Sequence, residues 1–320
     1  MSKVCVTGAA GFIGGHIAEA LLAQGHQVIG LDDFSSGKRE NAKLLSRHPD
    51  FQLVEGSIAD PAAVEKAAAG ARYIFHLAAM PSVPVSMKDP VLTNAVNVGG
   101  TVNVLEAARR HGVERTVLAC SCACYGDGPE QPKHEGLAVR PGSPYAAQKV
   151  ACEIYAQTYT TAYGVPCVGL RFFNVYGPRQ DPKSDYAAAI PRFATRLLAG
   201  ERPIVFGDGE QTRDFVHVSD VVRANLLATT AEKAPGQILN IASGKSASLL
   251  ELIGLIKKAI GPQAEGLEIE HQAPRLGDLR HSSADISLAR AVLGYDPRVP
   301  LAEGLAQLVQ SLRAGQARAA

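Results

Sequence analysis

A glycine-rich segment near the start of the chain constrains its fold more than any other feature. Residues 4–6 form an apolar run, and Gly8, Gly11 and Gly14 follow in the spacing G-x-x-G-x-x-G before an amphipathic stretch at residues 17–22. This order predicts a strand, a tight turn and a helix. Gly8 permits the turn, Gly11 lets backbone amides approach a pyrophosphate, and Gly14 allows the helix to pack closely on the strand. The segment therefore predicts a dinucleotide-binding βαβ unit.

The second predicted strand, residues 27–31, ends in an acidic residue, Asp32. A carboxylate at this place accepts hydrogen bonds from the hydroxyls of the adenine ribose. The same carboxylate would repel the 2′-phosphate of NADP at close range. We therefore expect NAD to be preferred over NADP.

Strand and helix patterns alternate through the first half of the chain. This alternation predicts an α/β fold with a doubly wound parallel sheet of the Rossmann type, whose ligands lie at the carboxyl ends of the strands. Further strands are predicted at residues 52–54, 73–75, 116–119 and 167–170, and helices at residues 93–111 and 144–163.

The chain has 320 residues, of which 46% are hydrophobic, so it is long enough to form about two domains. Residues 1–174 are predicted to form an NAD-binding Rossmann domain, to which later segments near residues 211–240 are expected to return. Proline and glycine become frequent after Phe172. Residues 175–320 are predicted to form mainly a smaller, mixed α/β domain that binds the substrate.

Charge and cysteine content narrow the function classes. A net charge of +1 with no basic stretch argues against nucleic acid or an anionic membrane as partner. A membrane span of about 18 apolar residues is not found in the sequence. The six cysteines lack the spacing of a secreted disulfide framework, so a cytoplasmic location is expected. Cys120, Cys122 and Cys124 have no histidine nearby, and we expect buried small side chains there and no metal site.

Tyr145 and Lys149 are four residues apart in a predicted helix, which places both side chains on one face. An ammonium group stabilises the phenolate form of a neighbouring tyrosine. A phenolate is suited to act as a general base towards a sugar hydroxyl. The spacing alone is common by chance, and it gains weight from the dinucleotide motif earlier in the chain.

These features together resemble the extended short-chain dehydrogenases/reductases, and within them the nucleotide-sugar epimerases. The resemblance covers nearly the whole chain. Besides the glycine turn and the Tyr145/Lys149 pair, the motifs that carry it are His76-Leu-Ala-Ala79, Asn97-Val-Gly-Gly-Thr101, Ser121 ahead of Tyr125-Gly126, Arg171-Phe-Phe-Asn-Val-Tyr-Gly-Pro178, Gly207-Asp-Gly209 with Thr212-Arg-Asp-Phe215, and Arg275-Leu-Gly-Asp278.

The resemblance implies a reaction and a set of site residues. In the family, the serine matching Ser121 binds the 4-hydroxyl of the sugar, Tyr145 removes its proton and Lys149 holds the nicotinamide ribose. Bound NAD takes a hydride from C4 and returns it to the opposite face of a transient 4-keto sugar. The implied cofactor-binding residues are Gly8, Gly11, Phe12, Ile13, Gly14, Asp32, Ser36, Ser57, Ile58, Leu77, Ala78, Ala79, Asn97, Tyr145 and Lys149. The implied substrate-binding residues are Ser121, Asn174, Ile190, Arg213, Arg275, Asp278 and Ser282.

One position departs from the family pattern, and two others separate members of the family that catalyse different reactions. The family usually has Gly-Asp-Ile after the third strand, where the aspartate meets the adenine amine, whereas this chain has Ser57 at the middle position. We therefore expect adenine to bind through a hydroxyl and more weakly. Related dehydratases and decarboxylases carry acids just after the serine, where this chain has Cys122 and Ala123. This difference favours epimerisation over elimination and decarboxylation.

Ser282, four residues after Asp278, narrows the range of expected substrates. In the resembling epimerases, a tyrosine here restricts the pocket to plain hexoses, and a small residue admits a 2-acetamido group. We expect UDP-N-acetylglucosamine and UDP-N-acetylgalactosamine, with UDP-glucose and UDP-galactose as further substrates. A UDP-glucuronate 4-epimerase and a non-catalytic NAD-binding protein are the alternatives. The family pairs through helices matching residues 93–111 and 144–163, so a homodimer is expected.

Overall fold

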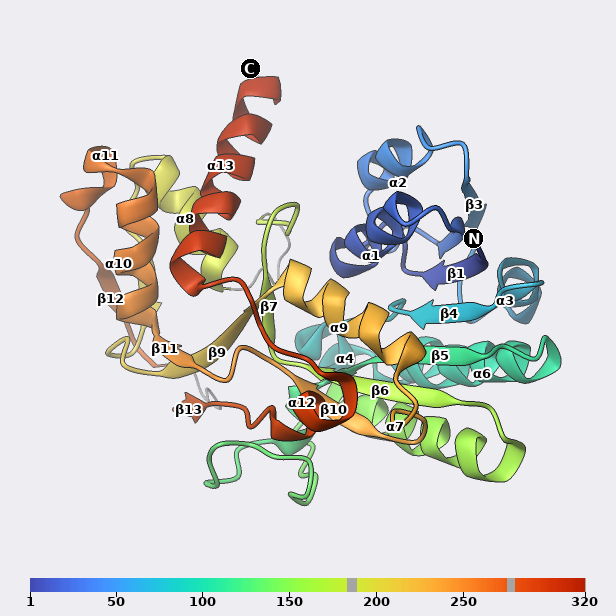
Figure 1. The fold of residues 1–320 in the computed structure, drawn as a ribbon. Coiled ribbons are helices and arrows are strands. Elements are labelled where there is room, and N and C mark those ends of the chain that lie inside the picture. Colours follow the sequence, from blue (N-terminus) through green and yellow to red (C-terminus); the bar gives the residue numbers. More distant parts are fainter. Residues whose placement is uncertain (183–188, 275–279, 320) are drawn as a thin grey trace.

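A seven-stranded parallel sheet forms the centre of the larger part of the computed structural model, which describes residues 1–182, 189–274 and 280–319. Its strand order is β10-β6-β5-β4-β1-β2-β3 (Figure 1). The order reverses between β1 and β4, which places the ligand crevice of such a sheet at the carboxyl ends of these strands. The strands are β1 (Lys3–Thr7), β2 (Gln27–Asp32), β3 (Phe51–Glu55), β4 (Tyr73–His76), β5 (Arg115–Ser121), β6 (Cys167–Phe172) and β10 (Ile238–Ile241).

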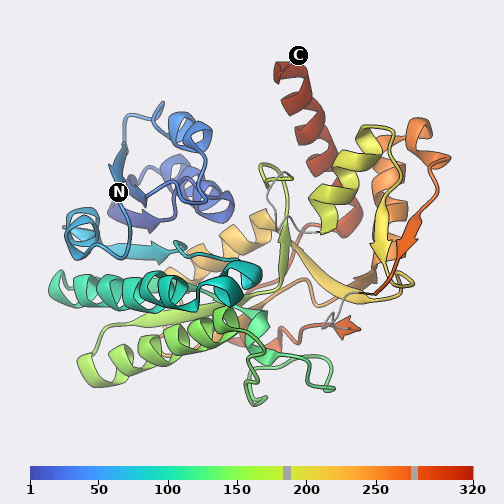
Figure 2. The ribbon, with the colours of Figure 1, turned by 180° about the vertical axis from the view of Figure 1, so that it is seen from behind.

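Helices cover both faces of the large sheet (Figures 1 and 2). Val4 and Val6 pack in the core on one face, and Cys5 between them packs in the core on the other. Because both faces are covered, the strands are apolar runs and not alternating ones. The predicted doubly wound α/β fold is confirmed. One face carries α1 (Phe12–Ala23), α2 (Arg39–Leu45), α9 (Val218–Thr230) and α12 (Ser287–Leu293), and the other carries α3 (Pro61–Ala68), α6 (Gly100–Arg110) and α7 (Pro144–Tyr163).

The helix predicted at residues 93–111 is present, but it contains a π-helical turn that the sequence did not predict. The chain is helical through α5 (Pro90–Asn94), the π-helical turn (Ala95–Gly99) and α6. In the wide turn, the carbonyl of Asn97 accepts hydrogen bonds from the Thr101 hydroxyl at 2.6 Å and from the Cys152 thiol at 3.3 Å. These side chains use a carbonyl that a regular helix would reserve for its own backbone, which accounts for the widening. By contrast, α7 has the predicted bounds.

The C-terminal part of the chain builds a smaller α/β unit with its own apolar core, seen beside the large sheet in Figure 1. Strand β9 pairs with β11, β13 and β7, and β12 pairs with β8. Within the described ranges, no helix is long and apolar enough to cross a membrane. The elements are β7 (Asn174–Tyr176), α8 (Ala189–Leu198), β8 (Ile204–Phe206), β9 (Thr212–His217), β11 (Ser246–Ser248), α10 (Leu249–Ile260), α11 (Pro262–Glu265), β12 (Glu270–Gln272), β13 (His281–Ser282) and α13 (Leu301–Ala319).

Candidate active site

The glycine turn between β1 and α1 has the geometry of an anion-binding turn. Gly8 has φ +71°, a conformation that favours glycine, and its amide donates to the Leu31 carbonyl at 2.7 Å. A Cβ at position 14 would lie 2.1 Å from the Gly8 carbonyl oxygen, so α1 can approach the turn because Gly14 has no side chain. In the described part of the chain, no side chain caps the N-terminus of α1 at Gly11. Its first-turn amides therefore face outward as a site for a pyrophosphate.

Asp32 lies directly beside this turn at the end of β2. Its Oδ2 accepts from the Ala10 amide and its Oδ1 from the Phe34 amide, each at 2.9 Å. Burial raises the pKa of Asp32, and the two amides oppose that shift. Each carboxylate oxygen keeps a second lone pair, which can accept from a ribose hydroxyl. The glycine turn and Asp32 together fit a dinucleotide, and the preference for NAD over NADP stays a prediction.

The segment after β4 packs directly against the glycine turn. The Ala78 amide donates to the Thr7 hydroxyl at 3.1 Å, and a Cβ at position 8 would lie 2.8 Å from the Ala78 nitrogen. Leu77 donates its amide to the Thr7 carbonyl at 3.1 Å. The predicted cofactor residues Leu77 and Ala78 are thus brought beside Gly8, and Ala79 follows them in the chain.

His76 fixes this segment through a chain of hydrogen bonds that the sequence did not predict. The Thr101 hydroxyl donates to a carbonyl, so its oxygen accepts from Nε2 of His76 at 3.0 Å. Nδ1 is then the acceptor for the Thr7 hydroxyl at 2.8 Å. Burial, with a smaller contribution from the Lys149 ammonium, lowers the pKa of His76 to about 3. His76 therefore stays neutral and serves as a fixed link between β4, β1 and α6.

Tyr145 and Lys149 lie on one face of α7, as predicted. The helix begins after Ser143, whose hydroxyl accepts from the Ala146 amide at 3.2 Å. Nζ of Lys149 is 6.0 Å from the centroid of the Tyr145 ring and donates to the Ala119 carbonyl at 2.8 Å. Because Ala119 is two residues before Ser121 in β5, this bond ties the helix to the strand that carries the serine.

The charge of Lys149 is maintained although the side chain is buried. Burial by itself would lower the pKa of Lys149, but the neighbouring Tyr145, Cys152 and Cys120 groups raise it above its ordinary value. The ammonium therefore stays protonated at neutral pH. It supplies a fixed positive charge beside the tyrosine.

Ser121 ends β5 with its hydroxyl oxygen accepting from the Ala123 amide at 3.2 Å. This bond fixes the oxygen and leaves the hydroxyl proton for another acceptor. The next residue, Cys122, is half-buried and lies near Asp214 and Arg213. Burial, reinforced by the Asp214 charge, raises the pKa of Cys122 to about 12. This thiol therefore keeps its proton at neutral pH and is unsuited to act as a catalytic acid or base, in line with the expectation from the sequence.

Asn97, a predicted cofactor residue, is engaged in contacts that hold α7 in place. Its Oδ1 accepts from the Met80 amide at 2.8 Å, and its Nδ2 donates to Oε1 of Gln148 on α7 at 2.8 Å. The Ser86 hydroxyl accepts from the Tyr145 amide at 3.1 Å. Gln148 and Ser86 are buried positions that the sequence analysis missed, because their role depends on contacts about 50 residues or more along the chain.

The remaining predicted cofactor residues lie around the same edge of the sheet. Phe12 and Ile13 form the first turn of α1, with the Phe12 ring edge-on to His16. Ile58 is buried against Gly100, where a Cβ would lie 2.6 Å from its side chain. Ser57 accepts from the Ala59 amide at 3.3 Å, and Ser36 is exposed in the turn after β2.

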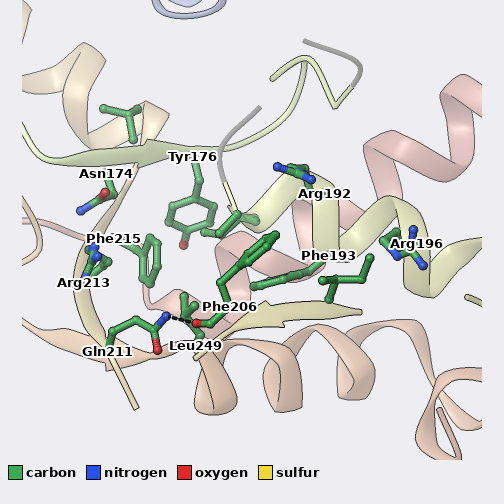
Figure 3. Close-up of a pocket in the computed structure, with 14 residues that line it drawn as sticks. Asn174, Tyr176, Arg192, Phe193, Arg196, Phe206, Gln211, Arg213, Phe215 and Leu249 are labelled. Atoms are coloured by element: carbon green, nitrogen blue, oxygen red, sulfur yellow. Dashed lines mark hydrogen bonds between the residues drawn. The ribbon is translucent and has the colours of Figure 1, made fainter. Parts of the chain in front are cut away.

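A cavity of about 290 Å³ in the smaller unit brings together three of the predicted substrate residues, Asn174, Ile190 and Arg213 (Figure 3). Nδ2 of Asn174 donates to the Asp214 carbonyl at 2.9 Å, which holds β7 against β9. Aromatic side chains and a further amide line the same space. These additional lining residues, which the sequence analysis missed, include Tyr176, Phe206, Gln211 and Phe215.

Ser282 is buried in β13, in register with Arg213 of β9. This pairing connects the predicted selectivity residue to the strand that lines the cavity. Arg275 and Asp278 lie outside the described residues. All six cysteines are described and are free thiols, with Cys120 and Cys124 buried as expected.

A doubly wound sheet with a glycine turn, an acid after the second strand and a serine, tyrosine and lysine near its carboxyl edge defines the short-chain dehydrogenase/reductase type of enzyme. The sequence matches the NAD dependent epimerase/dehydratase family over residues 4–242. The chain belongs to this family, and its cofactor is NAD.

Similarity to individual proteins extends over the full length. A UDP-glucose 4-epimerase of Mycolicibacterium smegmatis is 44% identical over 97% of this chain and 98% of its own. The structure of a UDP-N-acetylglucosamine 4-epimerase from Methanobrevibacter ruminantium M1, in complex with UDP-N-acetylmuramic acid, superposes with a TM-score of 0.93 at 36% identity, covering 98% of this chain and 99% of that one. A UDP-glucose 4-epimerase from Thermus thermophilus in complex with NAD superposes with a TM-score of 0.85 at 38% identity, covering 97% and 99%.

Proposed function

We propose that this protein is an NAD-dependent isomerase that inverts C4 of a UDP-hexose, with UDP-N-acetylglucosamine and UDP-N-acetylgalactosamine as its main substrate pair. The observation that carries the proposal is the placement of Ser121, Tyr145 and Lys149. Lys149 is bonded to β5 two residues before Ser121 and lies beside Tyr145. The relatives named above for UDP-glucose and for UDP-N-acetylglucosamine support the same reaction class.

Different residues of this chain transfer the proton and bind the sugar. When bound, NAD supplies the hydride acceptor and donor for C4. Tyr145 takes the proton of the 4-hydroxyl as a phenolate and returns it after the transient 4-keto sugar has turned over. Ser121, whose oxygen is fixed by the Ala123 amide, donates a hydrogen bond to the same sugar oxygen. Lys149 stabilises the phenolate by its charge.

The cavity in the smaller unit suits the nucleotide half of the substrate. Its aromatic side chains offer apolar surface to a base, and Arg213 offers a guanidinium group to a diphosphate. Arg213 already donates to the Thr212 carbonyl at 2.8 Å, which limits its rotation. We infer that UDP binds here and directs its sugar towards Ser121 and Tyr145.

A panel of UDP-sugars tests the proposal. Purified protein with NAD is incubated separately with UDP-N-acetylglucosamine, UDP-glucose and UDP-glucuronate, and the 4-epimers are resolved by chromatography. We expect conversion of the acetylated sugar, with slower conversion of UDP-glucose. Conversion of the uronic sugar alone would identify the UDP-glucuronate alternative. Failure to convert any UDP-sugar would favour a non-catalytic NAD-binding protein.

Ser282→Tyr tests the substrate preference. Ser282 is buried and in register with Arg213, and we infer that a tyrosine ring at this position would take the volume that a 2-acetamido group needs. We expect kcat/KM for UDP-N-acetylglucosamine to fall by about tenfold or more, equivalent to about 1.4 kcal/mol of transition-state binding. The loss for UDP-glucose should be much smaller. Equal losses on both substrates would show that Ser282 does not line the space around C2.

We also propose that the protein is a homodimer. Of the segments expected to pair, residues 144–163 form α7, whereas α6, which makes up much of residues 93–111, carries no exposed large hydrophobic side chain. We therefore place the interface on a patch of α7 together with α5 and α4 (Val83–Lys88), which pack against it. The patch carries exposed apolar side chains, including Val91 at 79%, Met87 at 63% and Ile154 at 58% exposure. A cluster of this kind on a protein surface indicates an interface. Because the same face would meet itself, a twofold dimer is the simplest assembly.

Light scattering checks the dimer. We expect a mass of twice the 33.7 kDa chain at micromolar concentration. Ile154→Glu should shift the protein towards the monomer, since it places a charge in the patch. Leu44→Glu, at an exposed apolar position on α2 outside the patch, is the control and should leave the mass unchanged. A wild-type protein that is monomeric would overturn the proposal.

A further inference from the structure

The turns that follow β2 and β3 lie side by side at the carboxyl edge of the sheet. Asp32 is in register with Glu55 at the ends of β2 and β3, so Asp33 and Ser57 follow one and two residues later in the two neighbouring turns. Asp32 is turned towards the glycine turn through its bond to the Ala10 amide. Asp33 is the next residue in the turn after β2, and a hydrogen bond from the Ser57 hydroxyl contributes to lowering the pKa of its carboxyl group.

The position of the adenine base follows from this strand order. The pyrophosphate site is at the turn after β1, and Asp32 after β2 is placed for the adenine ribose. A dinucleotide that continues in the same direction brings its base to the turn after β3. Asp33 and Ser57 therefore lie where the edge of the base arrives.

Asp33 is held as an ionised acceptor. Its Oδ1 accepts from the Ser35 hydroxyl at 2.6 Å and from the Ser35 amide at 2.9 Å. Although partial burial opposes it, hydrogen bonds from Ser35 and from the Ser57 hydroxyl hold the pKa of Asp33 below its usual range. Both bonds from Ser35 end on Oδ1. Each carboxylate oxygen has two lone pairs, so Oδ2 can accept a hydrogen bond from a ligand in addition to the one from Ser57.

The turn itself does not require an aspartate at this position. An asparagine side chain supports the same bond to the amide two residues later. It would also avoid the repulsion that a second carboxylate imposes on Asp32, whose pKa is raised by burial and additionally by Asp33. What an aspartate adds is a group that can accept hydrogen bonds and cannot donate them.

We propose that Asp33, supported by Ser57, accepts a hydrogen bond from the exocyclic amino group of adenine and selects NAD over dinucleotides whose base carries a carbonyl at that place. The carboxylate of Asp33 then offsets the loss that the sequence predicts for a serine at position 57. The pair acts on cofactor binding, apart from the sugar chemistry of Ser121 and Tyr145.

Calorimetry with two dinucleotides tests this assignment on protein freed of bound nucleotide. NAD carries the amino group, and nicotinamide hypoxanthine dinucleotide carries a carbonyl oxygen in its place. Wild-type protein should bind NAD tighter by about tenfold or more, since a site built for an N–H donor rejects an analogue that lacks it. Asp33→Asn should reduce the ratio of the two affinities at least about fivefold, because the asparagine side-chain amide can donate a hydrogen bond to the carbonyl oxygen of hypoxanthine.

Two further variants separate base recognition from a role in the turn. Asp60→Asn is the control, since Asp60 also caps a backbone amide near this edge, at 2.9 Å, and its loss removes the same charge. In Asp60→Asn, the ratio of the affinities for the two dinucleotides should stay at the wild-type value. Ser57→Ala should lower the ratio in the same direction as Asp33→Asn, which keeps the test open if the first variant folds poorly. Equal weakening of both dinucleotides in Asp33→Asn, or an unchanged ratio in both variants, would overturn the proposal.

Discussion

Replacing Tyr145 with phenylalanine is expected to lower kcat for 4-epimerisation by about 10²- to 10⁴-fold, the usual contribution of general acid–base catalysis. The substitution removes the hydroxyl and keeps the ring, so the packing of α7 is retained. Lys149 remains bonded to the Ala119 carbonyl because that contact does not involve the tyrosine. Single-turnover measurements of UDP-sugar conversion, together with thermal unfolding, would separate the loss of chemistry from a loss of stability.

Tyr163→Phe is the matched control for this result. Tyr163 ends the same helix, is 57% exposed and contacts the ring of Tyr159, with centroids 5.0 Å apart. Removal of its hydroxyl should leave kcat unchanged. If Tyr145→Phe retained more than about a tenth of wild-type kcat, the general base would have to be another residue.

The parts of the site that the sequence predicted are those set by short-range spacing. The glycine turn follows from three glycines within seven residues, and Asp32 from its place at the end of an apolar run. The shared face of Tyr145 and Lys149 follows from the helical repeat. In each case the decisive contacts lie within the first strand–helix–strand unit or within one helix, where local sequence controls the geometry.

The parts that the sequence did not predict depend on contacts between distant segments. His76 joins Thr7 and Thr101, which are 69 and 25 residues away. The π-helical turn at Ala95–Gly99 arises where Asn97 meets Cys152 on another helix. The sequence shows that these residues are polar. Their hydrogen-bond partners, however, are determined only when the sheet brings distant segments together. For the same reason, the contact between Asp33 and Ser57 emerges from the pairing of β2 with β3.

A buried ion pair beneath α7 is the clearest of these distant contacts. Arg171 on β6 binds Glu153 on α7 through two bonds, Nε to Oε1 at 2.9 Å and Nη2 to Oε2 at 2.8 Å. Its third nitrogen donates to the Tyr125 hydroxyl at 2.8 Å, and Tyr125 donates to Asn240 at 2.7 Å. The network joins α7 to three other segments next to the part of the helix that carries Tyr145 and Lys149.

Arg171→Met is expected to lower the free energy of unfolding by about 3–5 kcal/mol, the cost of leaving one partner of a buried ion pair uncompensated. Glu153 is 3% exposed, so water cannot replace the guanidinium group. Urea unfolding at fixed protein concentration measures the change. Arg72→Met is the control, because Arg72 pairs with Glu114 at 2.8 Å on the surface, and its loss should have a far smaller effect.

The double variant Arg171→Met/Glu153→Leu shows whether the cost comes from the stranded charge. The double variant replaces both charged side chains with apolar ones. Replacing a buried ion pair in this way often leaves the stability unchanged or raises it. We therefore expect the double variant to recover at least half of the stability lost in Arg171→Met. If it were instead less stable than the single variant, the packing of these side chains and not their charge would be what holds α7 to β6. Lys149 is four residues before Glu153 on the same face of α7, and the Glu153 charge acts on its pKa. We therefore expect the stranded carboxylate in Arg171→Met to lower kcat as well, and kcat should recover in the double variant.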